Sequence, residues 1–438
     1  MPDRLLSVSR SSLRCSLLLL LLASLAAATP AGAQVVPSGG EFPVNQETLD
    51  EQNDQRLAVA PDGTFALVWE SFGQDGSGEG IFLRRFAADG TPLGDEVQVN
   101  TETVGDQVDP DIAALAGGGF VVVWDSELQD GSLRGIYGQR YDAAGDPAGS
   151  EVPVNATTEG DQNDAVVAGA ADGGFLVAWE TQPVDDPTEE LVARRFDAAG
   201  SPVSGEMAVN TTTAGDQEDL DLASDAAGRF VFVWESDGQD GDLDSVVARL
   251  GDTAGTPEGA EIPVNTFSTG NQDNPRLLVR PDGSFAVAWE DDVQDATAPA
   301  VFLRLFRADG APTTGELQIN AGTGADFSPR LAFDPSGGVV VTWDSFLQDG
   351  DGAAVLAQHL NRSGAPRGAA EVLNLVTTGN QGFSQVGIGA DARGLAVWTS
   401  PDSDVDPLEG LFGRRFEVPI FWDDFETGDL THWSATVE

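Results

Sequence analysis

The chain has 438 residues, and its 72 acidic residues outnumber 22 basic residues, all of them arginine, so that the formal net charge is −50 at pH 7. This composition excludes nucleic acid as a partner, because phosphate binding needs a basic patch and the arginines are scattered through an acidic background. Anionic lipid headgroups are disfavoured for the same reason.

The N-terminus has the pattern of a secretory signal peptide. Three arginines precede an apolar run over residues 17–28 that is too short to span a bilayer, and small residues follow at 31–33. We therefore expect residues 1–33 to be cleaved off and the mature chain, residues 34–438, to be secreted, either extracellular or at the outer cell surface. Its net charge is then about −52.

The single cysteine, Cys15, lies within the expected signal peptide. The mature chain therefore has no thiol chemistry and no disulfide, but its 405 residues can bury a large core without such links. No later stretch is apolar for long enough to form a transmembrane helix.

Seven tryptophans recur along the mature chain at spacings of 54 or 55 residues. A Val-Asn or Ile-Asn pair and a glutamine keep the same period in most units, so we predict seven copies of one unit of about 55 residues. The repeat tryptophans are Trp69, Trp124, Trp179, Trp234, Trp289, Trp343 and Trp398.

Within the second unit, residues 111–116, 120–124, 136–141 and 151–155 are typical of four short strands separated by turns. The strand that carries the tryptophan is apolar nearly throughout, so both of its faces must be buried. Stacked neighbours cover both faces of each sheet in a propeller. We predict an all-β fold, a seven-bladed β-propeller with four antiparallel strands per blade, over residues 34–417.

The two ends of the repeat array predict a closed ring. The seventh unit ends near Phe416 without a fourth strand, whereas residues 41–45 match residues 151–155 and precede the first full unit. We expect this N-terminal segment to complete the seventh blade, because closure removes two exposed sheet edges. Residues 418–438 then form a C-terminal tail.

The repeat pattern resembles arrays in large secreted bacterial proteins, some of which also carry calcium-binding repeats. The resemblance covers roughly residues 41–416. It implies an extracellular propeller-like role and carries over no catalytic residue. The second unit shows the pattern best, in Trp124-Asp125-Ser126, Gln129-Asp130-Gly131, Gly135-Ile136 and Arg140-Tyr141.

The last segment, residues 421–434, looks like a short C-terminal tail seen on secreted bacterial proteins. Two roles stay open for it. It could serve sorting or surface attachment, or it could pack Trp422 or Trp433 against the ring to hide apolar area.

An aspartate follows each repeat tryptophan by six residues, in the loop between the second and third strands. Extra acids cluster beside it in two units, and hard cations bind several oxygens from one short loop, so calcium binding is chemically reasonable. In the alternative, the aspartate caps its own turn and pairs with an arginine of the third strand, such as Arg84, Arg194 or Arg249. The candidate calcium ligands are Asp237, Asp240, Asp242, Asp244, Asp349 and Asp351.

Residues for catalysis are scarce. The two histidines are His359, in the register of third-strand arginines and so expected to be a substituted strand residue, and His432 in the tail. The mature chain has no cysteine or lysine, so few of its residues could form a nucleophile-base triad. The irregular loops at 183–187 and 401–407 are interpreted as ordinary loop variation.

Two functional hypotheses follow. The first is a monomeric, non-enzymatic binding scaffold that presents its loop face to a protein, glycan or matrix ligand, with calcium in some acidic loops. The second is a secreted carbohydrate-active enzyme, a glycosidase or lyase, that uses carboxylates at the central mouth. A glycosidase needs two carboxylates about 5 to 9.5 Å apart there, and a lining of backbone and glutamine alone would remove its site.

Overall fold

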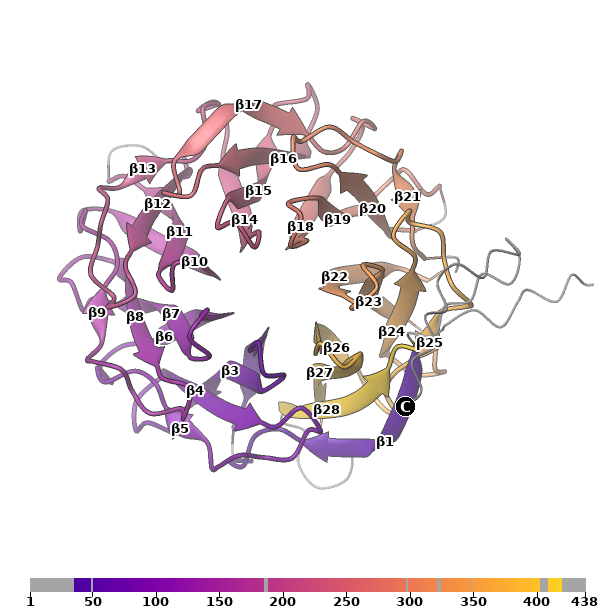
Figure 1. Cartoon of the computed structure of the whole chain (residues 1–438), viewed down its shortest axis with the longest axis horizontal. Coiled ribbons are helices and arrows are strands. Elements are labelled where there is room, and N and C mark those ends of the chain that lie inside the picture. Colours follow the sequence, from indigo (N-terminus) through magenta and orange to yellow (C-terminus); the bar gives the residue numbers. More distant parts are fainter. Residues whose placement is uncertain are drawn as a thin grey trace, which may run out of the picture.

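Seven antiparallel sheets of four strands each are arranged in a ring around a central axis (Figure 1). The computed structural model describes residues 35–48, 50–184, 188–296, 298–320, 324–346, 348–401 and 409–419. Within these ranges no helix is long and apolar enough to cross a lipid bilayer. The predicted seven-bladed β-propeller is confirmed. Outside the described residues lie the predicted signal peptide of residues 1–33, the tail from residue 420 on with His432, and residues 185–187 and 402–407 of the two irregular loops.

The blades are numbered in chain order, and the strands of each blade run from the axis to the perimeter. The innermost strands are β2 (Gln52–Val59), β6 (Gln107–Ala114), β10 (Asp161–Gly169), β14 (Gln217–Ser224), β18 (Gln272–Val279), β22 (Asp326–Phe333) and β26 (Gly382–Ile388). The second strands, which carry the repeat tryptophans, are β3 (Phe65–Phe72), β7 (Phe120–Glu127), β11 (Phe175–Gln182), β15 (Phe230–Asp237), β19 (Phe285–Asp291), β23 (Val339–Phe346) and β27 (Arg393–Pro401).

The third and outer strands complete each sheet. The third strands are β4 (Glu79–Phe86), β8 (Arg134–Tyr141), β12 (Glu190–Phe196), β16 (Asp244–Gly251), β20 (Ala300–Phe306), β24 (Ala353–Leu360) and β28 (Glu409–Glu417). The outer strands are β5 (Val97–Gln98), β9 (Val152–Pro153), β13 (Met207–Ala208), β17 (Pro257–Pro263), β21 (Leu317–Gln318), β25 (Glu371–Val372) and, in the seventh blade, β1 (Val36–Pro43).

In the second blade, all four strands differ in their bounds from the sequence prediction, and β7 and β8 extend to Glu127 and back to Arg134. The innermost strand begins at Gln107 and not at Asp111. Its first residues contain a bulge at Asp109, which has a positive φ of 52° and interrupts the alternation that marks a strand in sequence. The outer strand β9 is shorter than the predicted residues 151–155, and a short edge limits pairing with other chains.

The hydrophobic core lies between neighbouring blades. All seven repeat tryptophans are at most 1% exposed, and their strands are buried on both faces as predicted. One cluster joins Val68 and Leu83 of the first blade to Phe120 and Trp124 of the second. Further clusters repeat this arrangement around the ring, so each blade depends on its neighbours for burial.

The segment that precedes the first blade completes the seventh. β1 runs antiparallel to β28, with Pro37 opposite Phe416, and Figure 1 shows it at the perimeter beside β28. The predicted closure by residues 41–45 is confirmed, and the pairing strand begins earlier than expected, at Val36. The ring therefore has no blade with an unpaired third strand.

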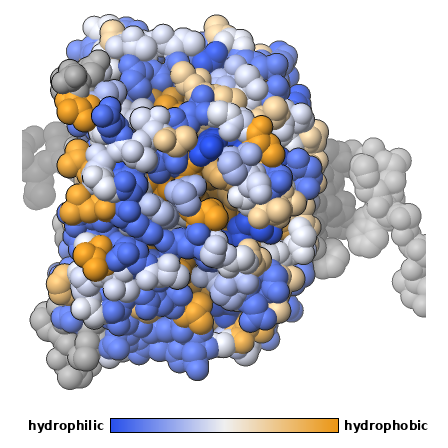
Figure 2. All heavy atoms as spheres, turned by 90° about the vertical axis from the view of Figure 1, so that its left-hand side faces the viewer, coloured by the Kyte–Doolittle hydropathy of each residue, from blue (hydrophilic) through white to orange (hydrophobic). Residues whose placement is uncertain are grey.

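The outer wall is largely hydrophilic where it faces the viewer in Figure 2, on the side of the ring that carries β8 and β9. Apolar residues are scattered among polar ones on this face and do not merge into one broad patch. Isolated exposed apolar residues are normal on soluble proteins and need no special role.

Candidate binding site in the central channel

The asparagine, glutamine and tryptophan that recur in the repeat form a structural network. In the second blade, Asn155 Oδ1 accepts a hydrogen bond from the amide of Ile136 at 2.9 Å. Its Nδ2 donates to Gln162 Oε1 of the next blade at 3.0 Å. The indole of Trp124 donates to Gln107 Oε1 at 3.1 Å. These contacts satisfy buried polar groups within and between blades, so the recurring residues hold the fold together.

Several of the described loop aspartates cap their own turns, as the alternative to calcium binding expects. Asp130 Oδ1 accepts from the amide of Ser132 at 3.0 Å, and its Oδ2 accepts from Asn155 Nδ2 at 3.3 Å. The same two contacts recur at Asp240 and Asp349. The partner of the capping aspartate is thus the repeat asparagine, and the predicted pairing with a third-strand arginine is wrong.

Arginines at one register of the third strand contact the preceding blade. Arg84 Nη1 donates to the carbonyl of Val44 at 2.6 Å. A residue that reaches across the blade boundary satisfies a buried carbonyl of the neighbouring sheet. The equivalent bonds are Arg194 to Val154 at 2.8 Å, Arg249 to Val209 at 2.5 Å and Arg304 to Val264 at 2.6 Å.

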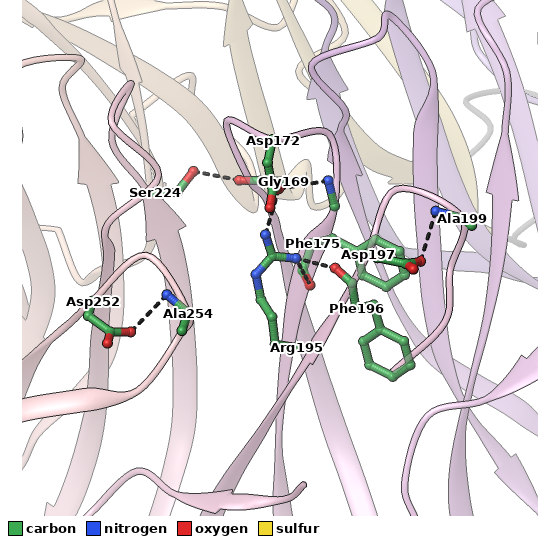
Figure 3. Close-up of polar contacts among 11 residues, drawn as sticks. Gly169, Asp172, Phe175, Arg195, Phe196, Asp197, Ala199, Ser224, Asp252 and Ala254 are labelled. Carbon is green, nitrogen blue, oxygen red and sulfur yellow. Dashed lines mark hydrogen bonds and ion pairs between the residues drawn. The ribbon is translucent and has the colours of Figure 1, made fainter. Parts of the chain in front are cut away.

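His359 is a strand residue, as expected, and makes a buried contact. Its register is that of Arg195, which donates to Asp172 Oδ1 at 2.6 Å and to the carbonyl of Phe175 at 3.0 Å (Figure 3). His359 Nε2 lies 2.6 Å from Asp334 Oδ2, and both side chains are fully buried. Burial would raise the pKa of Asp334, but hydrogen bonds from His359 and a neighbouring serine outweigh it and lower the pKa to about 2.

The six candidate calcium ligands do not gather in one place. Among the described residues, one group of three acids could hold a metal ion, Asp244 with Glu218 and Glu235, whose ligand atoms lie within 4.8 Å of one another. The loop pattern in the sequence does not include the two glutamates, because they lie on β14 and β15. The other candidates, Asp237, Asp240, Asp242, Asp349 and Asp351, lie outside this group. Calcium binding stays a prediction.

A cavity of about 220 Å³ lies at the centre of the ring and is lined by the innermost strands of all seven blades. One side chain from each blade, four residues after the repeat glutamine or its aspartate replacement, lines it. We call this set the channel ring. It consists of Arg56, Asp111, Val166, Asp221, Arg276, Arg330 and Gln385. The arginines and the glutamine belong to the adjacent fifth, sixth, seventh and first blades, and the acids belong to the second and fourth.

Each innermost strand has a bulge residue two positions before its channel-ring member, with φ between 47° and 54°. From the second blade to the seventh, the amide of this residue donates to the acid that follows the repeat tryptophan of the preceding blade. Asp109 donates to Glu70 at 2.5 Å, and Asp164 donates to Asp125 at 2.9 Å. The acids after the tryptophans therefore position the bulges. The bulge residues are Asp54, Asp109, Asp164, Asp219, Asn274, Ser328 and Phe383.

Burial and like charges shift the pKa values around the channel. Desolvation raises the pKa of Asp111 to about 6, and desolvation together with neighbouring acids raises that of Asp109 to about 6. Burial lowers the pKa of Arg330 well below its usual range, and the positive charges of Arg276 and Arg56 lower it further. The channel thus holds acids and arginines whose charged forms are disfavoured by burial and by like charges nearby.

Sequence reasoning missed the channel ring, although a signal for it exists. The repeat holds tryptophan at one position in every unit and glutamine at another in six of seven, whereas the channel-ring position holds arginine, aspartate, valine or glutamine. This position lies on the strand nearest the axis and varies although the rest of the repeat is regular. Such variation indicates that the fold does not require a particular residue there, so the position is a candidate for function.

Comparison with known proteins shows the fold alone. No family model and no curated protein matches the chain. A solved protein of unknown function from Dyadobacter fermentans DSM 18053 is 11% identical, with a TM-score of 0.53 over 88% of this chain and 99% of that one. The Dos1 propeller is 11% identical with a TM-score of 0.49 over 88% and 96%, and a GH93 α-L-arabinofuranosidase of Fusarium graminearum is 11% identical with a TM-score of 0.47 over 71% and 93%. The likeness to the Dyadobacter protein is a likeness of fold.

Proposed function

We propose that this chain is a secreted or cell-surface β-propeller that acts as a binding scaffold, with its ligand site in the central channel. One observation carries the proposal. The residues that hold the blades together are repeated almost without change, whereas the channel ring differs from blade to blade and brings charged groups to one cavity. In a fold built from repeats, a binding site is expected at positions where the residue differs between units and does not hold the units together.

A binding screen tests this function. The secreted mature chain is immobilised and exposed to glycan and protein arrays, beside a variant with Arg330→Gln and Asp111→Asn, which alters the channel ring alone. We expect at least one ligand to bind the parent chain at least tenfold more tightly than the variant. Ligands that bind both chains equally would place the site elsewhere and contradict the proposal.

A carbohydrate-active enzyme is the second candidate, and one observation favours it. The cavity lining is not limited to backbone and glutamine, because the acids Asp109, Asp111, Asp164, Asp219 and Asp221 line it. Two of them have a pKa of about 6, which suits a carboxyl group that donates or accepts a proton near neutral pH. Hydrolysis or cleavage of a polysaccharide that is lost in Asp111→Asn would support this function over simple binding.

A further inference from the structure

The three arginines of the channel ring occupy one continuous arc of the cavity wall. Arg276 and Arg330 come from the adjacent fifth and sixth blades, Gln385 follows in the seventh, and Arg56 comes from the first. All four residues line the same cavity of about 220 Å³. Four donor side chains therefore face one small volume in a chain that is otherwise strongly acidic.

None of the three arginines of this arc has a direct ion-pair partner among the described residues, although Asp111 and Asp221 attract them from farther away. Among the described residues, no carboxylate oxygen lies within 4.0 Å of these three guanidinium groups, whereas Arg195 and Arg229 each have an aspartate partner. The ion pairs of the described chain involve other arginines. A half-buried, unpaired cluster of like charges is costly, and an anion in the cavity would remove that cost.

The three arginines make few hydrogen bonds to the protein. Within the described part of the chain, each donates one hydrogen bond, to the carbonyl of the residue just before it. A guanidinium group has five N–H donors in a fork that matches a carboxylate. The three bonds are Arg56 to Gln55 at 3.2 Å, Arg276 to Pro275 at 2.7 Å and Arg330 to Pro329 at 2.9 Å.

The opposite wall limits the kind of anion. Asp111 and Asp221 face the cavity from the second and fourth blades, and each already accepts a backbone amide at 2.7 Å. Their remaining lone pairs can accept hydrogen bonds from hydroxyl groups. An ion that brings two or three charges into the cavity at one centre, such as phosphate, would be repelled by these acids and by the acidic bulge residues. One carboxylate in the cavity, on a sugar unit that carries hydroxyl groups, can bind the arginines and donate hydrogen bonds to the acids.

We infer that Arg56, Arg276 and Arg330 bind the carboxylate of a sugar acid, with the hydroxyl groups of the sugar directed to Asp111 and Asp221. This inference rests on the proposed binding function and names its ligand class. The cavity volume is below the roughly 300 to 1,000 Å³ of pockets that take drug-sized ligands, so it suits a single sugar unit.

Calorimetric titration of the mature chain tests the inference. The probes are galacturonate and glucuronate, their neutral counterparts galactose and glucose, short oligogalacturonides, and inorganic phosphate. We expect the sugar acids to bind at least tenfold more tightly than the neutral sugars, and phosphate to bind weakly. Oligogalacturonides that bind more tightly than the monomer identify a polysaccharide as the source of the carboxylate, and the reverse order identifies a free sugar acid.

Two channel variants and one control sharpen the test. Arg330→Gln should weaken the binding of the sugar acid about tenfold or more, the loss expected for one charge-assisted hydrogen bond, and Arg56→Gln repeats the test should Arg330→Gln not fold. Arg307→Gln removes an arginine that pairs with Asp309 on the surface and should leave affinity unchanged. Equal binding of sugar acids and neutral sugars, or unchanged affinity in the folded channel variants, overturns the inference.

Different results would overturn the sugar acid as the ligand and the channel as the binding site. A ligand without a carboxylate, bound by the parent chain and lost on Asp111→Asn, would overturn the sugar-acid inference and leave the channel as a binding site. Binding of every ligand unaffected by Asp111→Asn and Arg330→Gln would overturn both.

Discussion

Arg84 of the first blade donates a hydrogen bond of 2.6 Å to the carbonyl of Val44, just beyond the strand that completes the seventh blade. Glu96 adds to this junction by accepting from the amides of Gln46 at 2.6 Å and Glu47 at 3.0 Å. The same arginine and glutamate contacts occur where both strands belong to consecutive units, as between the third and fourth blades. The junction that closes the ring is therefore built like the others.

Loss of the Arg84 contact should destabilise the closed ring. Arg84→Ala leaves the fully buried Val44 carbonyl without this donor, so we expect the free energy of unfolding to fall by about 1 to 3 kcal/mol. Denaturant unfolding of the two chains measures the difference. Arg307→Ala, at an exposed surface pair, is the control and should change the free energy by less than about 0.5 kcal/mol. An equal effect of both substitutions would show that the junction contributes nothing specific.

The buried pair of His359 and Asp334 should show strong coupling. His359→Leu leaves the Asp334 carboxylate buried without its main partner and should cost about 3 to 5 kcal/mol. The double variant with Asp334→Asn removes the buried charge and should recover part of that loss. Denaturant unfolding of the single and double variants gives the coupling energy. Strictly additive effects would contradict an energetic link between the two side chains.

Stability should decrease as the pH rises from about 5 to about 9. Burial raises the pKa of Glu70 and Glu235 to about 9 and that of Glu290 and Asp344 to about 7, so the folded state holds protons that the unfolded state releases above about 4.5. Stability is then greatest below the unfolded pKa and is lost as the pH passes through the folded values.

Thermal melting at several pH values checks this dependence. Glu70→Gln keeps an acceptor for the amide of Asp109 and removes the titrating proton, so its melting midpoint should fall less between pH 5 and pH 9 than that of the parent. A parent midpoint that rises over this interval would contradict the predicted direction.

Calcium binding, predicted from the acidic loops, is tested by melting with calcium and then with chelator, because a ligand of the folded state raises its midpoint. Glu218→Gln and Asp351→Asn test two of the places where an ion could bind. A rise abolished by the first places the ion at Glu218, Glu235 and Asp244, and a rise abolished by the second places it in the loop of Asp349 and Asp351. Magnesium is the control. An unchanged melting midpoint in the presence of calcium would contradict calcium binding.

Secretion is tested by expressing the full chain with its own N-terminus. Cleavage after Ala33 should give an exported protein whose first residue is Gln34. N-terminal sequencing of the exported protein checks the site. A protein retained inside the cell with Met1 intact would contradict the signal-peptide prediction.

The sequence by itself determined the number of blades, their strand order and the closure of the ring. Each of these depends on local pattern: the period between Trp69 and Trp398, the apolar strand around each tryptophan, and the match of residues 41–45 to residues 151–155. A repeat that cannot bury its own sheet must stack, so periodicity alone predicts the architecture.

Only the tertiary structure decided which side chains meet. Arg84 and Val44 are 40 residues apart, and Arg56 and Arg330 share one cavity although most of the chain lies between them. Side chains on one strand point to different neighbours, and spacing in sequence does not say whether an arginine contacts its own loop or the neighbouring blade. The channel ring exists because closure brings one residue from every blade to a common axis, and no segment of sequence contains that contact.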